Sequence, residues 1–288
     1  MVGHNGLKLR MMVAGSILFG FYAALAAAVL WTFGTGTTVL ALLLLGSIGF
    51  VGFQYKFGKW MALRSVGAED MPEGREGRYN YGEIHRSTEQ ICREMDIDKP
   101  RLMVAEMGVP NAFAVGRKGA GVVVISKEII DILEHDELEG VIAHELAHIK
   151  NRDVVIMVLG QSIASMIGII AQWAVIIGGE RNIGTYLIAM VVGTIAQMIV
   201  MIFVMAISRY REYVADEDAA QYTRNPDAMA RALEKISSGA QGKEMRGEET
   251  VNALCIFGSE RGLLQKIFST HPPTEKRIER LRSHSVGY

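Results

Sequence analysis

Long runs of apolar residues alternate with charged segments along this chain of 288 residues. The stretch from Met11 to Tyr55 contains no charged side chain, and Gly34 and Gly36 break it near its middle. Two further uncharged runs cover Val154–Gly179 and Asn182–Ser208. A membrane-spanning helix needs roughly 20 apolar residues. The pattern therefore predicts four membrane spans, near residues 11–31, 37–57, 155–177 and 184–207.

These runs have two alternative interpretations. Buried helices in a large soluble core would also be apolar, but runs of this length, paired as hairpins, favour a membrane. The first run follows Lys8 and Arg10 and could be a signal peptide. A retained anchor is the better interpretation, because the run exceeds the usual apolar core of a signal peptide and a second span follows at once.

Lys and Arg residues flank the predicted spans unequally. One side has an uncharged turn around Thr32–Thr38 and a short turn in which Arg181 is the sole basic residue. The other side collects Lys8, Arg10, Lys56, Lys59, Arg64, Lys150, Arg152, Arg209 and Arg211. Because basic residues favour the cytoplasmic side, we expect a multi-pass protein of the cell (inner) membrane. Both termini and the segments 58–150 and 209–288 should be cytoplasmic.

The segments outside the spans have the pattern of a folded domain. Tyr81–Met95 has helical spacing, while Arg101–Glu106 and Gly121–Ser126 are short Val-rich runs that predict strands. Between these runs, Pro110–Gly116 predicts an edge segment or a tight connection. Helical patterns follow over Lys127–Asp153 with a junction near His135-Asp136, from Pro226 onward, and over Gly262–Ser269 and Thr274–Arg282.

Composition excludes several function classes. Half of the residues are apolar and 21% are charged, which excludes a disordered protein. The net charge of -1 gives no overall basic field, so we expect no nucleic-acid partner. Cys92 and Cys255 are too few for a disulfide framework and too far apart for a Cys-x-x-Cys site.

The segment His144-Glu145-Leu146-Ala147-His148 matches the H-E-x-x-H pattern. On a helix, residues four apart face the same way, so each imidazole can offer one nitrogen to a tetrahedral Zn²⁺. Glu145 can take a proton from the attacking water and deliver it to the leaving amine. The alternative is a pair of satisfied surface histidines. The largely apolar flanks predict a buried helix instead, on which two histidines need a partner such as a metal.

A catalytic zinc site takes three protein ligands and keeps one position open. His148 lies shortly before the third span and Glu212 shortly after the fourth, so an antiparallel hairpin would return Glu212 to the height of the histidines. Glu212 is the expected third ligand, with Glu217 as the alternative. Asp216 shares the helix face of Glu212 and suits a carboxylate that holds the distal N–H of a zinc-bound histidine. A single Glu beside arginines could also be a solvated surface group.

Four motifs together resemble the HtpX family of bacterial and archaeal membrane proteases, which are relatives of the type I CAAX prenyl endopeptidases. These motifs are Asn111-Ala-Phe-Ala, Glu139 to Asp153 around the H-E-x-x-H segment, Ser208-Arg-Tyr-Arg-Glu212-Tyr-Val-Ala-Asp216, and Ser269-Thr-His271-Pro-Pro-Thr. The likeness covers nearly the whole chain. It implies a zinc endopeptidase that degrades damaged or misassembled membrane proteins in quality control, often under heat or envelope stress. The family pattern also puts its third ligand on Glu212 and its supporting acid on Asp216.

Three further residues are candidates for contact with substrate. His271 resembles the family histidine near the substrate oxyanion, where an N–H donor would stabilise the tetrahedral intermediate; the alternative is a turn histidine that caps the next helix. Arg209 is a second oxyanion candidate, or else a juxtamembrane positive charge. Asn111 and the residues after it should line the cleft, where an exposed strand edge could hold extended substrate by main-chain hydrogen bonds.

We therefore expect a mainly α fold with a small β-sheet, four transmembrane helices and a gluzincin-like zinc metallopeptidase domain. Residues 1–60 would form the first hairpin, 61–153 and 209–288 the two parts of the catalytic domain, and 154–208 the second hairpin. The expected enzyme holds one Zn²⁺ per chain and cleaves internal peptide bonds of unfolded or membrane-protein segments on the cytoplasmic side of the bilayer. The sequence leaves its oligomeric state open.

Two other functions fit parts of the pattern. An intramembrane protease of the site-2 type carries H-E-x-x-H within the bilayer, but charged residues on both sides of the motif here favour the membrane mouth. A non-enzymatic zinc-binding membrane adaptor would have no need of Glu145 between the two histidines. Cleavage mapped to the interior of a span would favour the first alternative, and an inactive zinc-loaded protein would favour the second.

Overall fold

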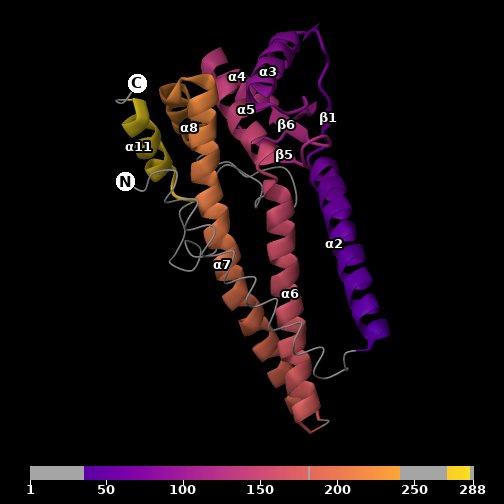
Figure 1. The fold of residues 1–288 in the computed structure, drawn as a ribbon. Helices are drawn as coiled ribbons and strands as arrows, with labels where there is room; N and C mark the ends of the chain where they lie inside the picture. Colours follow the sequence, from indigo (N-terminus) through magenta and orange to yellow (C-terminus); the bar gives the residue numbers. More distant parts are fainter. Residues whose placement is uncertain (1–35, 181, 241–270, 286–288) are drawn as a thin grey trace. The chain divides into compact units, whose positions relative to one another are not determined.

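The computed structural model describes residues 36–180, 182–240 and 271–285 (Figure 1). The described residues form two compact units. The first holds residues 36–56 and Ile156–Tyr210, and the second holds Phe57–Val155, 211–240 and 271–285. Helices α2 (Thr37–Ser65), α6 (Asp153–Gly178) and α7 (Ile183–Thr223) each have residues in both units.

In the first unit, α6 and α7 pack against each other through small residues. A side chain at Gly160 would lie 3.1 Å from Val204, and one at Gly168 would lie 3.0 Å from the carbonyl oxygen of Gly193. Small residues let two helices approach closely. Close packing of this kind stabilises helix pairs in a membrane, where the hydrophobic effect does not drive them together. Large apolar side chains are exposed elsewhere on the two helices, including Trp173 at 57% and Ile177 at 70%.

The predicted spans are matched only in part. Within the described residues, α6 and α7 are the two helices that are long and apolar enough to cross a membrane, and they contain the predicted spans 155–177 and 184–207. The predicted span 37–57 lies in α2, which is helical but is not one of those two. The predicted span 11–31 lies outside the described residues. The number of four spans is therefore not confirmed.

The second unit is built on a four-stranded sheet with the order β1-β4-β6-β5. Its strands are β1 (Glu69–Asp70), β4 (Arg101–Ala105), β5 (Ala112–Val115) and β6 (Val122–Ser126). Strand β4 pairs with β6 in parallel, while β1 and β5 are antiparallel to their neighbours. A two-stranded ribbon is formed by β2 (Arg75–Glu76) and β3 (Tyr79–Asn80).

Both faces of this sheet are buried. On β6, Val123 and Ile125 point into one apolar cluster while Val122 and Val124 point into another. This division follows from the two-residue period of a strand. The first cluster is covered by helices α3 (Tyr81–Met95), α5 (His135–Lys150), α8 (Pro226–Ala240) and α11 (Thr274–Ser285). The last turns of α2 contribute Ala62 and Val66 to the second cluster.

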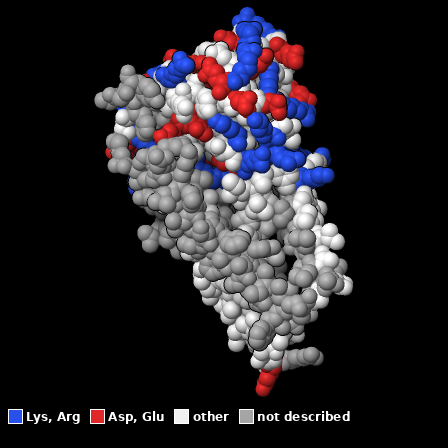
Figure 2. All heavy atoms as spheres, viewed as in Figure 1, with Lys and Arg blue, Asp and Glu red and all other residues white. Residues whose placement is uncertain are grey.

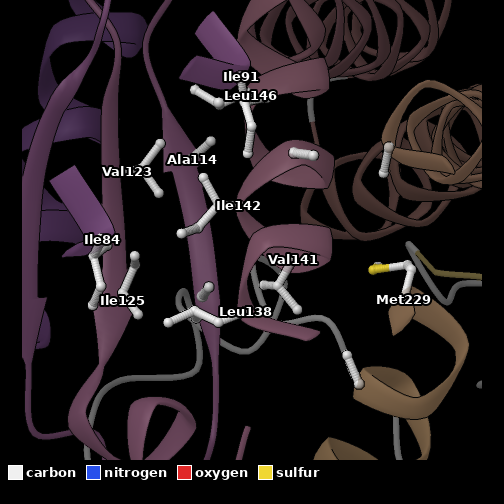
Figure 3. Close-up of a cluster of buried hydrophobic side chains, with 14 of the residues drawn as sticks. Ile84, Ile91, Ala114, Val123, Ile125, Leu138, Val141, Ile142, Leu146 and Met229 are labelled. Atoms are coloured by element: carbon white, nitrogen blue, oxygen red, sulfur yellow. The ribbon is translucent and has the colours of Figure 1, made fainter. Parts of the chain in front are cut away.

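Helix α5 lies between the sheet and α8. Figure 3 shows Ile142 and Leu138 facing the strands on one side, while Val141 lies on the side of Met229 of α8. At Gly140 the two helices are so close that a side chain would lie 3.3 Å from the Met229 Cα atom. Because α5 is enclosed on both sides, Glu137, His144 and Glu145 are buried with it.

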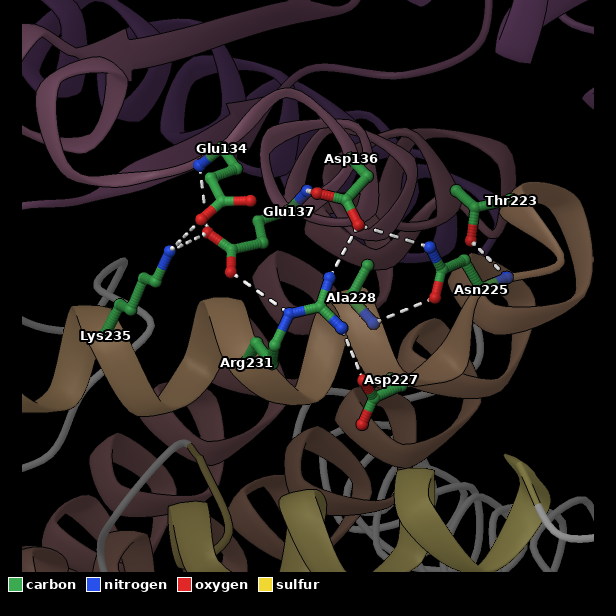
Figure 4. A network of polar contacts seen from close by, with 9 residues as sticks. All are labelled: Glu134, Asp136, Glu137, Thr223, Asn225, Asp227, Ala228, Arg231 and Lys235. Atoms are coloured by element: carbon green, nitrogen blue, oxygen red, sulfur yellow. Dashed lines mark hydrogen bonds and ion pairs between the residues drawn. The ribbon is translucent and has the colours of Figure 1, made fainter.

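The N-terminal end of α5 is tied to α8 by charge. Glu134 and Glu137 form a capping box at the start of the helix. Glu137 is fully buried, and its two oxygens contact Arg231 Nε at 3.3 Å and Lys235 Nζ at 2.7 Å (Figure 4). Asp136 accepts a further contact from Arg231 at 2.6 Å. These ion pairs fix the rotation of α5 against α8.

The predicted elements outside the membrane are largely confirmed. The helix over Tyr81–Met95 is α3, and the two Val-rich runs are β4 and β6. The edge segment is β5, at the end of the sheet. The junction near His135 separates α4 (Lys127–Ile132) from α5. The helix expected over Gly262–Ser269 lies outside the described residues.

Candidate metal centre and active site

Helix α5 brings two imidazole rings together, one helical turn apart. His144 is 1% exposed, and its Nε2 lies 3.1 Å from Nε2 of His148. The two rings meet edge to face, with centroids 4.7 Å apart. The apolar flanks of the motif pack into the core on both sides, so His144 is buried as the sequence predicted, whereas the His148 side chain stays 16% exposed.

Helix α7 supplies a carboxylate to the same point. Glu212 Oε2 lies 3.6 Å from His144 Nε2, and Glu212 Oε1 lies 3.4 Å from His148 Nε2. Tetrahedral ligands about 2.0–2.1 Å from a zinc ion lie about 3.3 Å from one another. The two Nε2 atoms are 3.1 Å apart, and each lies 3.4–3.6 Å from a different oxygen of the Glu212 carboxylate, so these three side chains fit around a zinc ion.

Within the described residues, these three side chains are the one group of metal-binding residue types that could hold an ion. Glu217, the alternative third ligand, instead lies 3.6 Å from the Arg280 guanidinium. The structure thus brings together the three residues that the sequence predicts as ligands, which could hold a metal ion. Glu212 and not Glu217 faces the two imidazoles.

A carboxylate stands behind each imidazole. Asp216 Oδ1 lies 3.0 Å from His144 Nδ1, and Asp153 Oδ2 lies 2.6 Å from His148 Nδ1. A carboxylate at Nδ1 keeps the proton on that nitrogen and leaves the Nε2 lone pair for a metal. The sequence predicted this role for Asp216. It did not single out Asp153.

The surroundings favour a positive charge between the rings. Burial alone would lower the pKa of His144, but Asp216 and Glu212 outweigh it and raise the pKa to about 9. Burial lowers the pKa of His148 to about 4, despite the opposing charge of Glu212. The two carboxylates therefore favour a positive charge at His144, while His148 stays neutral and keeps a lone pair on its ring.

Two buried arginines hold the supporting carboxylates. Arg277 is fully buried and donates from Nε and NH2 to the two oxygens of Asp216, at 2.8 and 2.7 Å. Burial would raise the pKa of Asp216, but Arg277 and His144 lower it to about 2. Arg211, 3% exposed, pairs with Asp153 at 2.5 Å and also donates to the Asp153 carbonyl oxygen at 2.6 Å.

Glu145, between the two histidines in sequence, is also buried. It is 3% exposed, and the backbone of Ala114 in β5 hydrogen-bonds its carboxylate. Burial raises the pKa of Glu145 above its usual range, while His148 and His144 oppose that change. A carboxylate with a raised pKa is a better proton acceptor near neutral pH than an exposed one. The side chain thus suits general acid–base work.

The remaining predicted residues lie at different distances from this centre. His271 is inside it, with Nδ1 at 2.8 Å from Glu212 Oε2. Asn111 is 1% exposed; its backbone is bonded to Ser126, and its amide lies 3.9 Å from the Met107 sulfur. Arg209 lies on α7 in the first unit, three residues before Glu212. The roles of these three in substrate binding stay predictions.

Sequence reasoning missed Asp153, Arg211 and Arg277. Asp153 follows Arg152, whose φ of 57° interrupts the helix between α5 and α6. The Asp153 carboxylate then lies against His148 Nδ1. The interruption has no signature in residue type. Arg277 sits among charged residues of α11, a composition that is typical of a solvated helix. The available signal was its position six residues after His271, because a chain that brings His271 to the site also brings Arg277 near it.

Comparisons with known proteins agree with this geometry. A family model described as Peptidase family M48 matches residues 79–285. A "Protease HtpX homolog" from Halobacterium salinarum is 53% identical, over 95% of this chain and 100% of its own. Another, from Salinibacter ruber, is 37% identical over 86% of this chain and 88% of its own.

A solved structure with a similar fold is the crystal structure of Ste24p from S. mikatae. The TM-score is 0.57 at 15% sequence identity, over 96% of this chain. This chain spans 64% of the length of that structure. The match to the family model covers most of the chain and agrees with the full-length relatives. The chain therefore belongs to peptidase family M48, as a relative of the HtpX-type proteases.

Proposed function

We propose that this chain is a membrane-bound, zinc-dependent endopeptidase. The observation that carries the proposal is that the two imidazole Nε2 atoms and the Glu212 carboxylate converge at separations that suit one zinc ion, beside the buried carboxylate of Glu145. The motif lies on α5, outside the two apolar helices. That location favours hydrolysis beside the membrane over an intramembrane site.

The protein side chains divide the chemistry among them. His144, His148 and Glu212 would hold one Zn²⁺, which supplies Lewis acidity that lowers the pKa of a water and polarises a peptide carbonyl. Glu145 takes a proton from the attacking water and passes it to the leaving amine. His271, whose Nδ1 lies 2.8 Å from Glu212 Oε2, would donate to the developing oxyanion, with Arg209 as the second candidate.

Substrate would lie along β5. This strand ends the described sheet, and its Ala114 backbone already reaches Glu145. An extended peptide added to that edge would gain main-chain hydrogen bonds with little dependence on sequence. Asn111, directly before β5, would fix the start of the strand through its backbone bonds with Ser126. The expected substrates are unfolded or membrane-protein segments.

The cellular role follows from the family and the charge pattern. We place α6 and α7 in the cell membrane, with the second unit on the cytoplasmic side, because Lys and Arg residues gather on that side of the predicted spans. The resemblance to HtpX proteases suggests degradation of damaged or misfolded membrane proteins under stress.

A protease assay on the full-length protein in detergent tests the catalytic proposal. Zinc-loaded wild type should hydrolyse fluorescent casein, whereas Glu145→Gln should lose roughly 10²–10⁴-fold in rate because its proton acceptor is removed. Zinc content should be equal in both proteins. Glu139→Gln, on the same helix but paired with His135, is the matched control and should keep wild-type activity. Undiminished hydrolysis by Glu145→Gln would refute the mechanism.

A further inference from the structure

The end of α2 that belongs to the second unit carries exposed aromatic and basic side chains. Phe57 and Trp60 are 48% and 53% exposed, with ring centroids 5.9 Å apart. Arg64, one turn further on, places its guanidinium carbon 5.6 Å from the centre of the Trp60 ring. Exposed aromatic rings next to cations with long apolar stems are typical of the boundary between a bilayer and water.

A basic loop lies beside this helix end. The loop Gly116–Gly121 joins β5 to β6, and Lys59 of α2 donates to the Ala120 carbonyl oxygen at 2.9 Å. A turn bond from Ala120 N to Arg117 O, 2.8 Å long, closes the loop. Gly116 has a φ of 111°, and a side chain there would lie 2.4 Å from the Ala120 oxygen. The loop presents Arg117 and Lys118, both exposed, and the Lys118 ammonium donates to the Asp96 carbonyl oxygen at 2.6 Å.

Cations outnumber acids on this surface. Arg101 adjoins it, because its N–H donates to the Gly121 carbonyl oxygen at 3.1 Å. The acidic neighbours are Asp70, which pairs with Arg101, Asp96, which lies 3.9 Å from the Lys118 ammonium, and Asp98 near Gly119. The cations are Lys59, Arg64, Arg101, Arg117 and Lys118. Figure 2 shows Lys and Arg side chains gathered along the lower edge of the charged unit on the face in view.

We propose that Phe57–Arg64 and the loop Gly116–Gly121 form a binding surface for the anionic phospholipid headgroups of the surrounding bilayer. The proposal rests on the membrane location given under the proposed function. Helix α2 supports this occupant, because the stretch from Thr37 to Tyr55 before the aromatic pair is uncharged and apolar. The rings would sit at headgroup depth and the cations would contact the phosphates. A preformed loop loses little freedom on binding.

The surface is directly connected to the candidate active site. The loop follows Val115, the last residue of β5, and Ala114 of the same strand bonds to Glu145. Headgroups bound to the loop would therefore hold the substrate edge of the sheet close to the membrane. Polypeptide segments that emerge from the bilayer would meet that edge first.

Native mass spectrometry of the full-length protein in detergent tests the surface. The protein is titrated with phosphatidylglycerol or with phosphatidylcholine, and the lipid-bound fractions give the two affinities. A cation near an anionic membrane surface contributes about fivefold in affinity. We therefore expect a clear preference for phosphatidylglycerol and a loss of about 25-fold in Arg117→Gln/Lys118→Gln.

The control is Arg75→Gln/Arg86→Gln, which removes two exposed cations elsewhere on the same unit and should bind phosphatidylglycerol as the wild type does. Equal binding of the two lipids, or full affinity in the Arg117/Lys118 variant, would overturn the proposal. The proposal would also be overturned if soluble glycerol 3-phosphate displaced phosphatidylglycerol as effectively as a second lipid does. That result would show a site for phosphate anions in general and not for a lipid headgroup at the membrane. Zinc content and casein hydrolysis in detergent should be unchanged, so failure here leaves the peptidase proposal intact.

Discussion

Each of the two histidines of the candidate metal site contacts a carboxylate through its Nδ1 atom, and each carboxylate pairs with a buried arginine. The two chains of contacts are Arg277–Asp216–His144 and Arg211–Asp153–His148. A buried carboxylate without a partner would be costly, and the arginines supply that partner. The arrangement fixes both rings with Nε2 toward the same point.

Asp153→Asn tests whether this support matters for the metal. The amide cannot carry the negative charge that orients the His148 ring and pairs with Arg211, so zinc affinity should fall about 10–100-fold. Competition with a zinc chelator measures the change. Asp98→Asn, an exposed acid on the same unit, should leave the affinity as it is. Equal affinities in the two variants would show that Asp153 supports the fold and not the ion.

Single residues differed in how far the sequence revealed them. The spacing of His144 and His148 puts both rings on one face of a helix, with Glu145 between them in sequence. Asp216 lies four residues after Glu212 and therefore shares its helix face. Asp153 depends on a backbone break at Arg152, and Arg277 depends on a helix docking far away in sequence. Neither event leaves a pattern in residue type.

Among the elements, α5 controls the site, because it carries both histidines and is enclosed by the sheet and α8 (Figure 3). Its depth is set by Gly140, where the backbone of α8 leaves no room for a larger residue. The ion pairs of Glu137 set its rotation (Figure 4). Packing of α5 is therefore expected to affect both stability and zinc binding.

Gly140→Leu tests that packing. The new side chain would push against Met229 of α8, and overpacking of this kind costs about 1–3 kcal/mol, so the thermal midpoint of unfolding in detergent should fall. Gly58→Leu, in α2, is the control, because a side chain there meets nothing within 4 Å. An unchanged midpoint in Gly140→Leu would mean that the two helices are less closely packed than described.

Long elements were predictable and short ones were not. Strands β4 and β6 are apolar on both faces, so they appeared as continuous Val-rich runs. Strands β1, β2 and β3 have two residues each, too few for any period to show. The junction between α4 and α5 appeared because charged residues interrupt the apolar pattern there.

At the scale of the whole molecule, α7 (Ile183–Thr223) is a helix whose residues belong partly to the first unit and partly to the second. Its apolar part contains the predicted fourth span, and its polar end carries Glu212 and Asp216. The sequence allowed this connection to be foreseen, because a hairpin of two spans must return the chain to the side from which it left. The sequence did not reveal that Arg277 of the C-terminal helix α11 contacts both of these carboxylates.

The proposed orientation predicts which positions face the cell exterior. In a background with Cys255→Ser, Asn182→Cys between α6 and α7 should react with a membrane-impermeant maleimide in intact cells. Glu94→Cys, exposed on α3, should react only after the membrane is permeabilised. Cys92 is buried and should stay silent. The reverse labelling pattern would invert the orientation.

The central claim is that a carboxylate from beyond the membrane hairpin completes the metal site. Zinc per chain, measured by atomic emission on detergent-purified protein, tests it most directly. Wild type and Glu217→Ala should each hold about one zinc after dialysis against a weak chelator, whereas Glu212→Ala should lose most of it. Retention of the full zinc content by Glu212→Ala would contradict the account.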